Sequence, residues 1–211
     1  MYLPTQFQAD EQQTRDLLDG VTVADLITPT TAGLFATFLP LIYQPAPEGA
    51  GWGSLRGHLA RNNDHWKLEP NGDSLVLVHG PDAYISPGWY PSKREHGRVV
   101  PTWNYLIAQV RGQLVIHHDP AWLKQTVRLL TDRHEAVQEH PWSVDDAPGQ
   151  FIEDQLRGII GVELRIVSVQ AKAKLGQNRT DADIDGAIVG MQRAGLGDVA
   201  LAMARANGRV S

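Results

Sequence analysis

Six runs of β-forming residues, several of them joined by short turns, constrain the fold of this chain more than any other feature. The strongest covers residues 159–175, and the runs at 22–28 and 33–44 are separated by a Thr/Pro-rich turn typical of a β-hairpin. The other runs lie at residues 54–60, 74–87 and 105–117. Because closing an antiparallel sheet removes its exposed edges, this pattern predicts a β-barrel.

The alternation of side chains predicts which faces of the strands are buried. In the run at 33–44, both alternating sets are apolar, so we expect that strand to be buried on both sides. In the run at 159–175, Glu163 and Arg165 alternate with apolar residues, so one face of its first half is expected to be wet. Gly112 interrupts its own run as a β-bulge would.

Helices are predicted between the strands and after the last one. Capping residues place helix starts at Asp10, at Asp119-Pro120 and at Pro148. The tail begins with a capping box at Thr180 and holds two helices that are split at residues 195–197. Hairpin strands with inserted helices indicate an α+β fold. We expect one domain, with a barrel over residues 1–179 and a helical C-terminal appendage over 180–211.

Composition excludes several classes of protein. The 211 residues are 42% hydrophobic and 20% charged, which is ordinary for a globular protein with a sizeable core. The chain has no cysteine, which excludes a disulfide framework, a thiolate zinc site and a cysteine nucleophile. No signal peptide and no apolar stretch of membrane-spanning length is visible, so a cytoplasmic protein without membrane contact is expected.

The net charge of −5 is unfavourable for strong DNA binding, which normally requires a basic patch or stripe. Local basic clusters occur at Lys93-Arg94 and around Lys172, Lys174 and Arg179, but they are small. An anionic cofactor is the simpler partner for such clusters.

Polar and aromatic residues gather in four clusters at strand ends. Their sequences are GHLARNNDHW at 57–66, YISPGWYPSK at 84–93, VPTWNY at 100–105 and KLGQNR at 174–179. Amides can hydrogen-bond the edge of a heterocycle, and indole or phenol rings can cover its face. Hydroxyl and cationic groups can bind a phosphate through charge-assisted hydrogen bonds. The clusters therefore predict a site for a phosphorylated flat ring.

Taken singly, each candidate also has an ordinary structural explanation. His58 could be a hydrogen-bonded structural histidine, Arg61 and Arg179 could form surface ion pairs, and Trp89 and Trp103 could be core aromatics. Only the co-occurrence of the clusters favours a binding site.

Other kinds of site find little support. The sequence has no glycine-rich dinucleotide or Walker-type loop. His117 and His118 are neighbours on a predicted strand and point to opposite faces, so they make a poor metal-chelating pair. Ser86 and Ser92 lack the context of a hydrolase nucleophile. We therefore expect no metal site and assign no catalytic residue.

The four clusters, in this order and together with the opening MYLPTQF, resemble the PaiB-type FMN-binding negative transcriptional regulators. These belong to the flavin-binding split-barrel superfamily, and the resemblance covers nearly the whole chain. It implies a split β-barrel, a homodimer and FMN bound non-covalently at the dimer interface.

Carried over by motif, the resemblance implies a set of FMN-binding residues: His58, Arg61, Asn62, Trp89, Ser92, Lys93, Thr102, Trp103, Asn104, Tyr105, Gln177, Asn178 and Arg179. Among them we assign Lys93, Ser92 and Arg179 to the phosphate. Asn104 and Asn62 are assigned to the edges of the ring, and Trp103 or Trp89 to its face. The chain departs from the family pattern at Asn63-Asp64, where a proline is expected, and at Gly176, where a serine is common. The glycine removes one hydroxyl that could reach a phosphate.

Three functions remain open from the sequence. The resemblance implies an FMN-binding transcriptional regulator, whose tail helices around residues 195–197 could mimic a DNA-binding helix-turn-helix. A flavin-dependent oxidoreductase acting on a small substrate is the alternative, since FMN carries the chemistry and no acid-base pair is required. Binding of haem through His58 or His79 is a third reading. Neither the substrate nor a DNA target follows from the sequence.

Overall fold

The computed structural model describes residues 1–210, whose contacts divide the chain into two compact units. Unit 1 combines Met1–Leu17, His79–Ala108 and residues 170–210. Unit 2 combines Leu18–Val78 and Gln109–Val169. The expected boundary between residues 179 and 180 stays a prediction.

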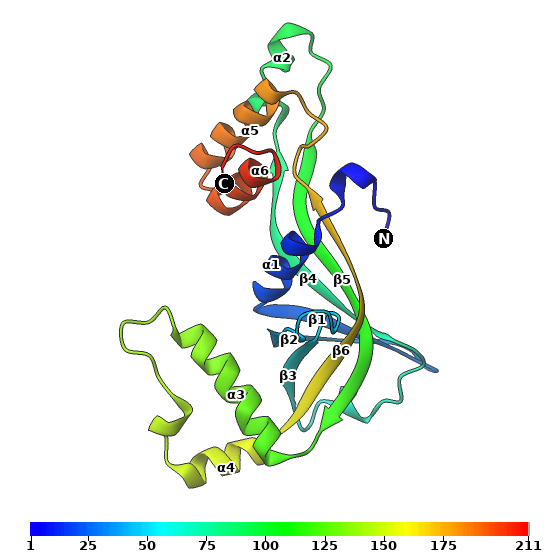
Figure 1. Cartoon of the computed structure of the whole chain (residues 1–211), viewed down its shortest axis with the longest axis vertical. Helices are drawn as coiled ribbons and strands as arrows, with labels where there is room; N and C mark the ends of the chain where they lie inside the picture. Colours follow the sequence, from blue (N-terminus) through cyan, green and yellow to red (C-terminus); the bar gives the residue numbers. More distant parts are fainter. Residues whose placement is uncertain (211) are drawn as a thin grey trace. The chain divides into compact units, whose positions relative to one another are not determined.

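Six antiparallel strands form one closed barrel in the order β1-β2-β3-β6-β5-β4 (Figure 1). Their bounds are Val23–Thr30 for β1, Gly33–Gln44 for β2, Ser54–Ala60 for β3, Ser74–Ile85 for β4, Thr102–His117 for β5 and Ile159–Lys174 for β6. This arrangement confirms the predicted α+β split barrel. Gly112, which the sequence marks as an interruption, lies inside β5 where a Cβ would overlap the main chain of Arg165.

Helices connect and follow the strands, as predicted. The α-helices are α1 Glu11–Asp19, α2 Ser92–Glu95, α3 Pro120–Glu135, α4 Gly149–Arg157, α5 Asp181–Arg193 and α6 Gly197–Ala206. Short 3-10 helices lie at Thr5–Phe7, Asp64–Lys67, Pro87–Trp89 and Val144–Asp146. Asp119 caps α3 by accepting a hydrogen bond from the Ala121 amide, and Thr180 caps α5 through the Asp183 amide. No helix within residues 1–210 is long and apolar enough to cross a membrane.

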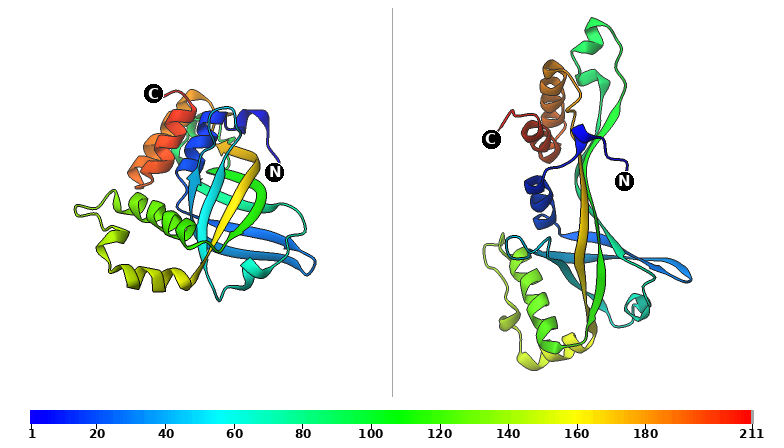
Figure 2. Two further views of the ribbon diagram at one scale, coloured as in Figure 1. Left: turned by 60° about the horizontal axis from the view of Figure 1, so that its bottom comes forward. Right: turned by 45° about the vertical axis from the view of Figure 1, so that its right-hand side comes forward.

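In unit 2, the hairpin of β1 and β2 turns at Gly33, whose φ of 118° favours glycine (Figure 2). The expectation that β2 is buried on both sides is wrong for its first half. Leu34 is 77% exposed and Phe38 is 67% exposed. The reason lies in the pairing of the sheet, because β3 pairs with β2 only from Leu41 to Gln44.

In unit 2, the expected wet face of β6 is confirmed at Arg165, which is exposed, and is wrong at Glu163. Glu163 is buried, and its carboxylate accepts hydrogen bonds from Ser54 Oγ at 2.9 Å and Arg56 Nε at 2.9 Å. His117 Nε2 lies 3.1 Å from the second carboxylate oxygen, and its ring stacks on Trp122 of α3. Glu163 is thus buried among polar partners, and Trp122 of α3 covers one of them, His117.

In unit 1, α5 and α6 lie side by side against the ends of β4 and β6 (Figure 1). Their shared core contains Ala83, Ile85, Ala173, Leu175, Met191 and Met203. Side chains alternate across a strand, so the residues between these core positions point to the opposite face of the sheet. That opposite face, which we call the open face, carries Tyr84, Trp103, Tyr105, Lys172 and Lys174.

Candidate functional site

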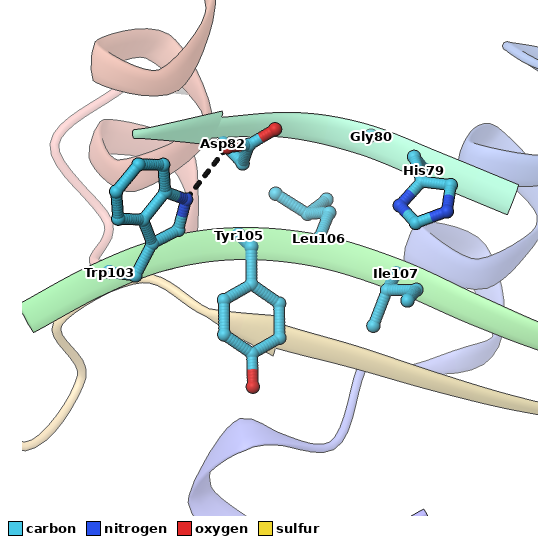
Figure 3. Close-up of a pocket in the computed structure, with 7 residues that line it drawn as sticks. All are labelled: His79, Gly80, Asp82, Trp103, Tyr105, Leu106 and Ile107. Atoms are coloured by element: carbon cyan, nitrogen blue, oxygen red, sulfur yellow. Dashed lines mark hydrogen bonds between the residues drawn. The ribbon is translucent and has the colours of Figure 1, made fainter. Parts of the chain in front are cut away.

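A pocket of about 250 Å³ lies on β4 and β5 within unit 1 (Figure 3). It is lined by His79, Gly80, Asp82, Trp103, Tyr105, Leu106 and Ile107. Trp103, Tyr105 and Ile107 are alternate residues of β5 and therefore share one face of that strand. Two aromatic side chains, Trp103 and Tyr105, thus border one small concave region together with His79 and Asp82.

Trp103 is held in a fixed orientation although half of it is exposed. Its indole Nε1 donates a hydrogen bond of 2.7 Å to Asp82 Oδ1, as Figure 3 shows. The Tyr84 ring meets it edge to face, with 6.3 Å between the ring centroids. At 51% exposure, the indole offers a flat apolar surface whose polar edge is already satisfied.

Two lysine side chains of β6 lie close to the Tyr105 ring. The Lys172 and Lys174 ammonium nitrogens are 5.5 Å and 5.8 Å from the centroid of its ring. Lys174 Nζ also donates to Thr102 Oγ1 at 2.6 Å and to the Trp103 carbonyl at 2.9 Å. The structure therefore brings three predicted residues, Thr102, Trp103 and Tyr105, together around one cation.

The predicted residues of the second cluster lie around α2 and contact α5. Ser92 is buried, and its hydroxyl donates to Asp183 Oδ2 at 2.7 Å while its amide donates to Oδ1 at 3.1 Å. Lys93 is exposed beside it. Trp89 packs against α5, where a Cβ on Gly190 would overlap the indole. A phosphate role for Ser92 stays a prediction and would require its hydroxyl to leave Asp183.

Arg179 lies in the same part of unit 1 as these residues. Its guanidinium carbon is 4.9 Å from the centroid of the Tyr90 ring. Burial raises the pKa of the Tyr90 phenol, and the positive charge of Arg179 opposes that rise only in part. Arg179 thus already has an aromatic partner, and its predicted phosphate contact remains a prediction.

The other predicted residues of unit 1 have mainly structural contacts. Asn104 is 2% exposed, and its amide lies 3.5 Å from the sulfur of Met203 in α6. Gln177 closes the turn after β6, because its side chain accepts from the Leu175 amide and donates to the Ala173 carbonyl. Asn178 is exposed next to it. The flavin contacts predicted for Asn104, Gln177 and Asn178 stay predictions.

The first predicted cluster belongs to unit 2. Burial lowers the pKa of His58, and its Nδ1 is buried without a hydrogen-bond partner among residues 1–210. Arg61 donates to the carbonyls of Arg157 at 2.7 Å and Ile159 at 3.1 Å, which ties the end of β3 to the α4–β6 connection. Asn62 is exposed.

Asp82, Leu106 and Ile107 of the pocket were not predicted as site residues, and His79 was predicted only as a haem ligand. Tyr84, Lys172 and Lys174 of the open face were predicted only as members of sequence clusters. The signal for the lysines was present, because Lys172 and Lys174 alternate with buried alanines in a strand. Lysines at i and i+2 of a strand share a face. No group of three or more metal-binding side chains occurs in the described part of the chain.

Comparison with known proteins agrees with this architecture. Residues 1–168 match the family described as "Putative FMN-binding domain". The protease synthase and sporulation protein PAI 2 of Bacillus subtilis is 29% identical over 186 residues, covering 87% of this chain and 85% of the relative. An uncharacterized protein of Emericella nidulans, AN0679, is 31% identical and covers 88% of this chain and 86% of its own.

Among solved structures, an FAD- and haem-binding protein of Mycobacterium smegmatis matches with a TM-score of 0.55. It is 14% identical, and the match covers 85% of this chain and 79% of that one, so it shows a shared fold. The family match covers most of the chain, and it confirms the resemblance to the PaiB-type proteins and the expected cofactor. The chain belongs to the family of FMN-binding split-barrel domains, with FMN as its cofactor.

Proposed function

We propose that the open face of unit 1 binds the FMN ring and that the protein is a flavin-dependent oxidoreductase for a small substrate. The observation that carries this proposal is the Trp103 indole, which is half exposed, fixed by Asp82 and placed beside Tyr105 in a pocket. A flat ring that packs on an already oriented indole orders few additional side chains, which favours binding.

The residues of the open face suit the parts of FMN. The indole and phenol rings provide apolar surface for the flavin ring. Lys174 and Thr102 provide donors for hydroxyl and phosphate oxygens, and Lys93 of α2 is the further donor that the sequence assigns to the phosphate. FMN supplies hydride and electron transfer when it is bound. The chain's own residues then bind and orient the ring and exclude water from one side of it.

One chain offers only part of such a site. Small-molecule sites usually measure about 300–1,000 Å³ and enclose most of the ligand. The pocket of about 250 Å³ is smaller than this range and is open on one side. This supports the homodimer that the resemblance implies, in which a second copy would cover the exposed side of the flavin.

The direct test is the colour of the purified protein and its response to a reductant. Preparations that contain the cofactor are expected to be yellow, to release FMN on denaturation and to bleach when NAD(P)H is added. A colourless protein that fails to bind added FMN would contradict the binding proposal. A yellow protein that no nicotinamide or other donor reduces would contradict the oxidoreductase proposal alone.

The phosphate contact that the sequence assigns to Lys93 has its own test. Lys93→Ala is expected to weaken FMN binding by about 1–3 kcal/mol if a charge-assisted hydrogen bond is lost. Since Lys93 is exposed, the free energy of unfolding should stay unchanged. An unaltered dissociation constant would remove Lys93 from the site.

Negative transcriptional regulation is the second candidate, implied by the resemblance to the PaiB-type proteins and compatible with the short link between α5 and α6. The exposed face of α6 carries Asp198, Leu201 and Arg205, a poor set for reading base edges. Direct DNA binding through these helices is therefore the weaker proposal. A promoter mobility shift that survives moderate salt would reverse this order.

The expected cytoplasmic location also stays a prediction.

A further inference from the structure

Two lysines on the open face have no anionic partner. Lys172 and Lys174 are two positions apart on β6, so both side chains lie on one side of the sheet. Lys172 is only 8% exposed. Among residues 1–210, neither ammonium forms an ion pair with a carboxylate. Burying an ammonium group is costly unless an anion compensates it, so this pair stands out from the surface lysines.

The present partners of both lysines are neutral. Lys172 Nζ donates to the Tyr2 carbonyl at 3.2 Å, and Lys174 Nζ donates to Thr102 Oγ1 and the Trp103 carbonyl. The Tyr105 ring lies within cation–π distance of both nitrogens. An ammonium has three N–H donors, so each lysine retains at least one donor without an acceptor in the described chain.

The surroundings also favour an incoming anion. Tyr105 lines the pocket, and both ammonium nitrogens lie within 5.8 Å of its ring centroid, so the lysines are neighbours of a residue of the pocket wall. Asp82 is the carboxylate that lines this pocket, and its Oδ1 accepts the hydrogen bond from Trp103. The two cations outnumber this one carboxylate.

We propose that Lys172 and Lys174, both beside the Tyr105 ring, form an oxyanion site next to the flavin pocket. It takes a phosphate or carboxylate group that lies next to the flavin ring on Trp103. The proposal rests on the proposed function and adds the chemical class of the group bound. Two sources share this chemistry: the phosphate of FMN itself, or the acidic group of the small molecule that reacts with the flavin.

The test replaces each lysine by methionine, which keeps the length of the apolar stem and removes the charge. Lys172→Met and Lys174→Met are compared with Lys124→Met, an exposed lysine of α3 in unit 2. Binding of FMN and of riboflavin is measured by flavin fluorescence on the full chain. Binding of inorganic phosphate is measured by calorimetry with and without FMN. Lys174→Arg serves as the variant that should restore binding if a methionine variant folds poorly.

The two possible sources of the acidic group, FMN or the reacting molecule, predict losses in different affinities of the lysine variants. If FMN supplies it, the methionine variants lose about tenfold or more in FMN affinity and none in riboflavin affinity. If the reacting molecule supplies it, both flavin affinities stay unchanged, and the FMN-loaded variants lose their binding of phosphate. Unchanged affinities for FMN and phosphate in both variants would overturn the site. A wild type that binds phosphate through these lysines but no flavin would overturn the proposed function and leave the oxyanion site standing.

Discussion

At the scale of single residues, Asp183 holds α2 in place next to α5. Its carboxylate accepts two hydrogen bonds from Ser92 and lies in the first turn of α5, where a negative charge is favourable. The bonds are buried, so a partner removed from Asp183 cannot be replaced by bulk water. Loss of the Ser92–Asp183 contact should therefore lower the stability of the fold, although the sequence assigns Ser92 to the flavin phosphate.

Ser92→Ala is expected to destabilise the protein by about 1–3 kcal/mol, because a buried carboxylate oxygen loses its donor. The midpoint of urea denaturation measures the change. Ser168→Ala, at an exposed serine of β6, is the control and should stay within about 0.5 kcal/mol of the wild type. Equal midpoints for the two variants would show that the Ser92–Asp183 contact is not needed for stability.

Glu163 is the second residue with a specific consequence, in this case for pH. Burial alone would raise the pKa of its carboxyl, but the Ser54 hydroxyl, the Arg56 guanidinium and His117 outweigh burial and hold the pKa below its ordinary value of 4.5. A carboxyl with a depressed pKa in the folded state stabilises the fold above its unfolded pKa. That contribution is lost as the pH falls through the folded pKa.

Glu163→Gln is accordingly expected to lower the free energy of unfolding at pH 7 by about 1–3 kcal/mol. The gap between wild type and variant should shrink as the pH falls below 4.5, because protonation then removes the same charge in the wild type. Denaturant titrations at several pH values measure this gap. Glu153→Gln, at an exposed glutamate of α4, should show no such gap. A Glu163 gap that stays constant down to acid pH would contradict the role of the charge.

At the scale of elements, α5 packs closely on the segment that carries Trp89. Gly190 lies inside α5, and an added Cβ would overlap the Trp89 indole. A glycine inside a helix normally costs about 1 kcal/mol relative to alanine, so replacing it usually stabilises. Here the steric overlap should reverse that sign.

Gly190→Ala is therefore expected to lower the thermal unfolding temperature by an amount equivalent to about 1–3 kcal/mol. Gly197→Ala is the matched control, since Gly197 begins α6 and an added Cβ would meet no atom within 4 Å. That control should be neutral or slightly stabilising. If both variants are stabilised alike, the close packing of α5 on Trp89 is contradicted.

Local signals allowed most elements to be predicted. The β1–β2 hairpin, the Asp119 cap of α3 and the split between α5 and α6 all follow from short sequence patterns, and each is present. Burial was harder to predict. Phe38 is exposed because β3 ends its pairing before reaching it, and Glu163 is buried among Ser54, Arg56 and His117. Both depend on partners distant in sequence, which alternation within one strand does not report.

Across the whole chain, the contacts of the candidate site were as hard to predict as burial, because they also join distant segments. Trp103 and Tyr105 could be predicted because aromatic residues cluster visibly in the sequence. Lys174 was visible as a member of a basic cluster, but its contact with Thr102 was not, because that contact joins strands that are far apart along the chain. Ser92 and Gln177 carry motif signals, yet their polar groups are engaged with Asp183 and the backbone. A sequence motif therefore points to a residue without telling which contact that residue makes in the fold.

The proposed homodimer is a prediction at this scale. Sedimentation of the FMN-loaded protein should give twice the 23.2 kDa mass of one chain. The expected flavin content is one FMN per chain, since each copy has one open face. A mass of a single chain at concentrations where FMN is fully bound would show that one copy suffices for the site.

In the proposed site FMN lies on the indole of Trp103, and a titration followed by flavin fluorescence measures the contribution of this contact. Trp103→Ala should weaken FMN binding by about 1 kcal/mol, roughly fivefold, because an aromatic contact is lost. Trp142→Ala, at another exposed tryptophan in unit 2, should bind as the wild type does. Identical dissociation constants for wild type and Trp103→Ala would contradict the account and place the flavin elsewhere on the chain.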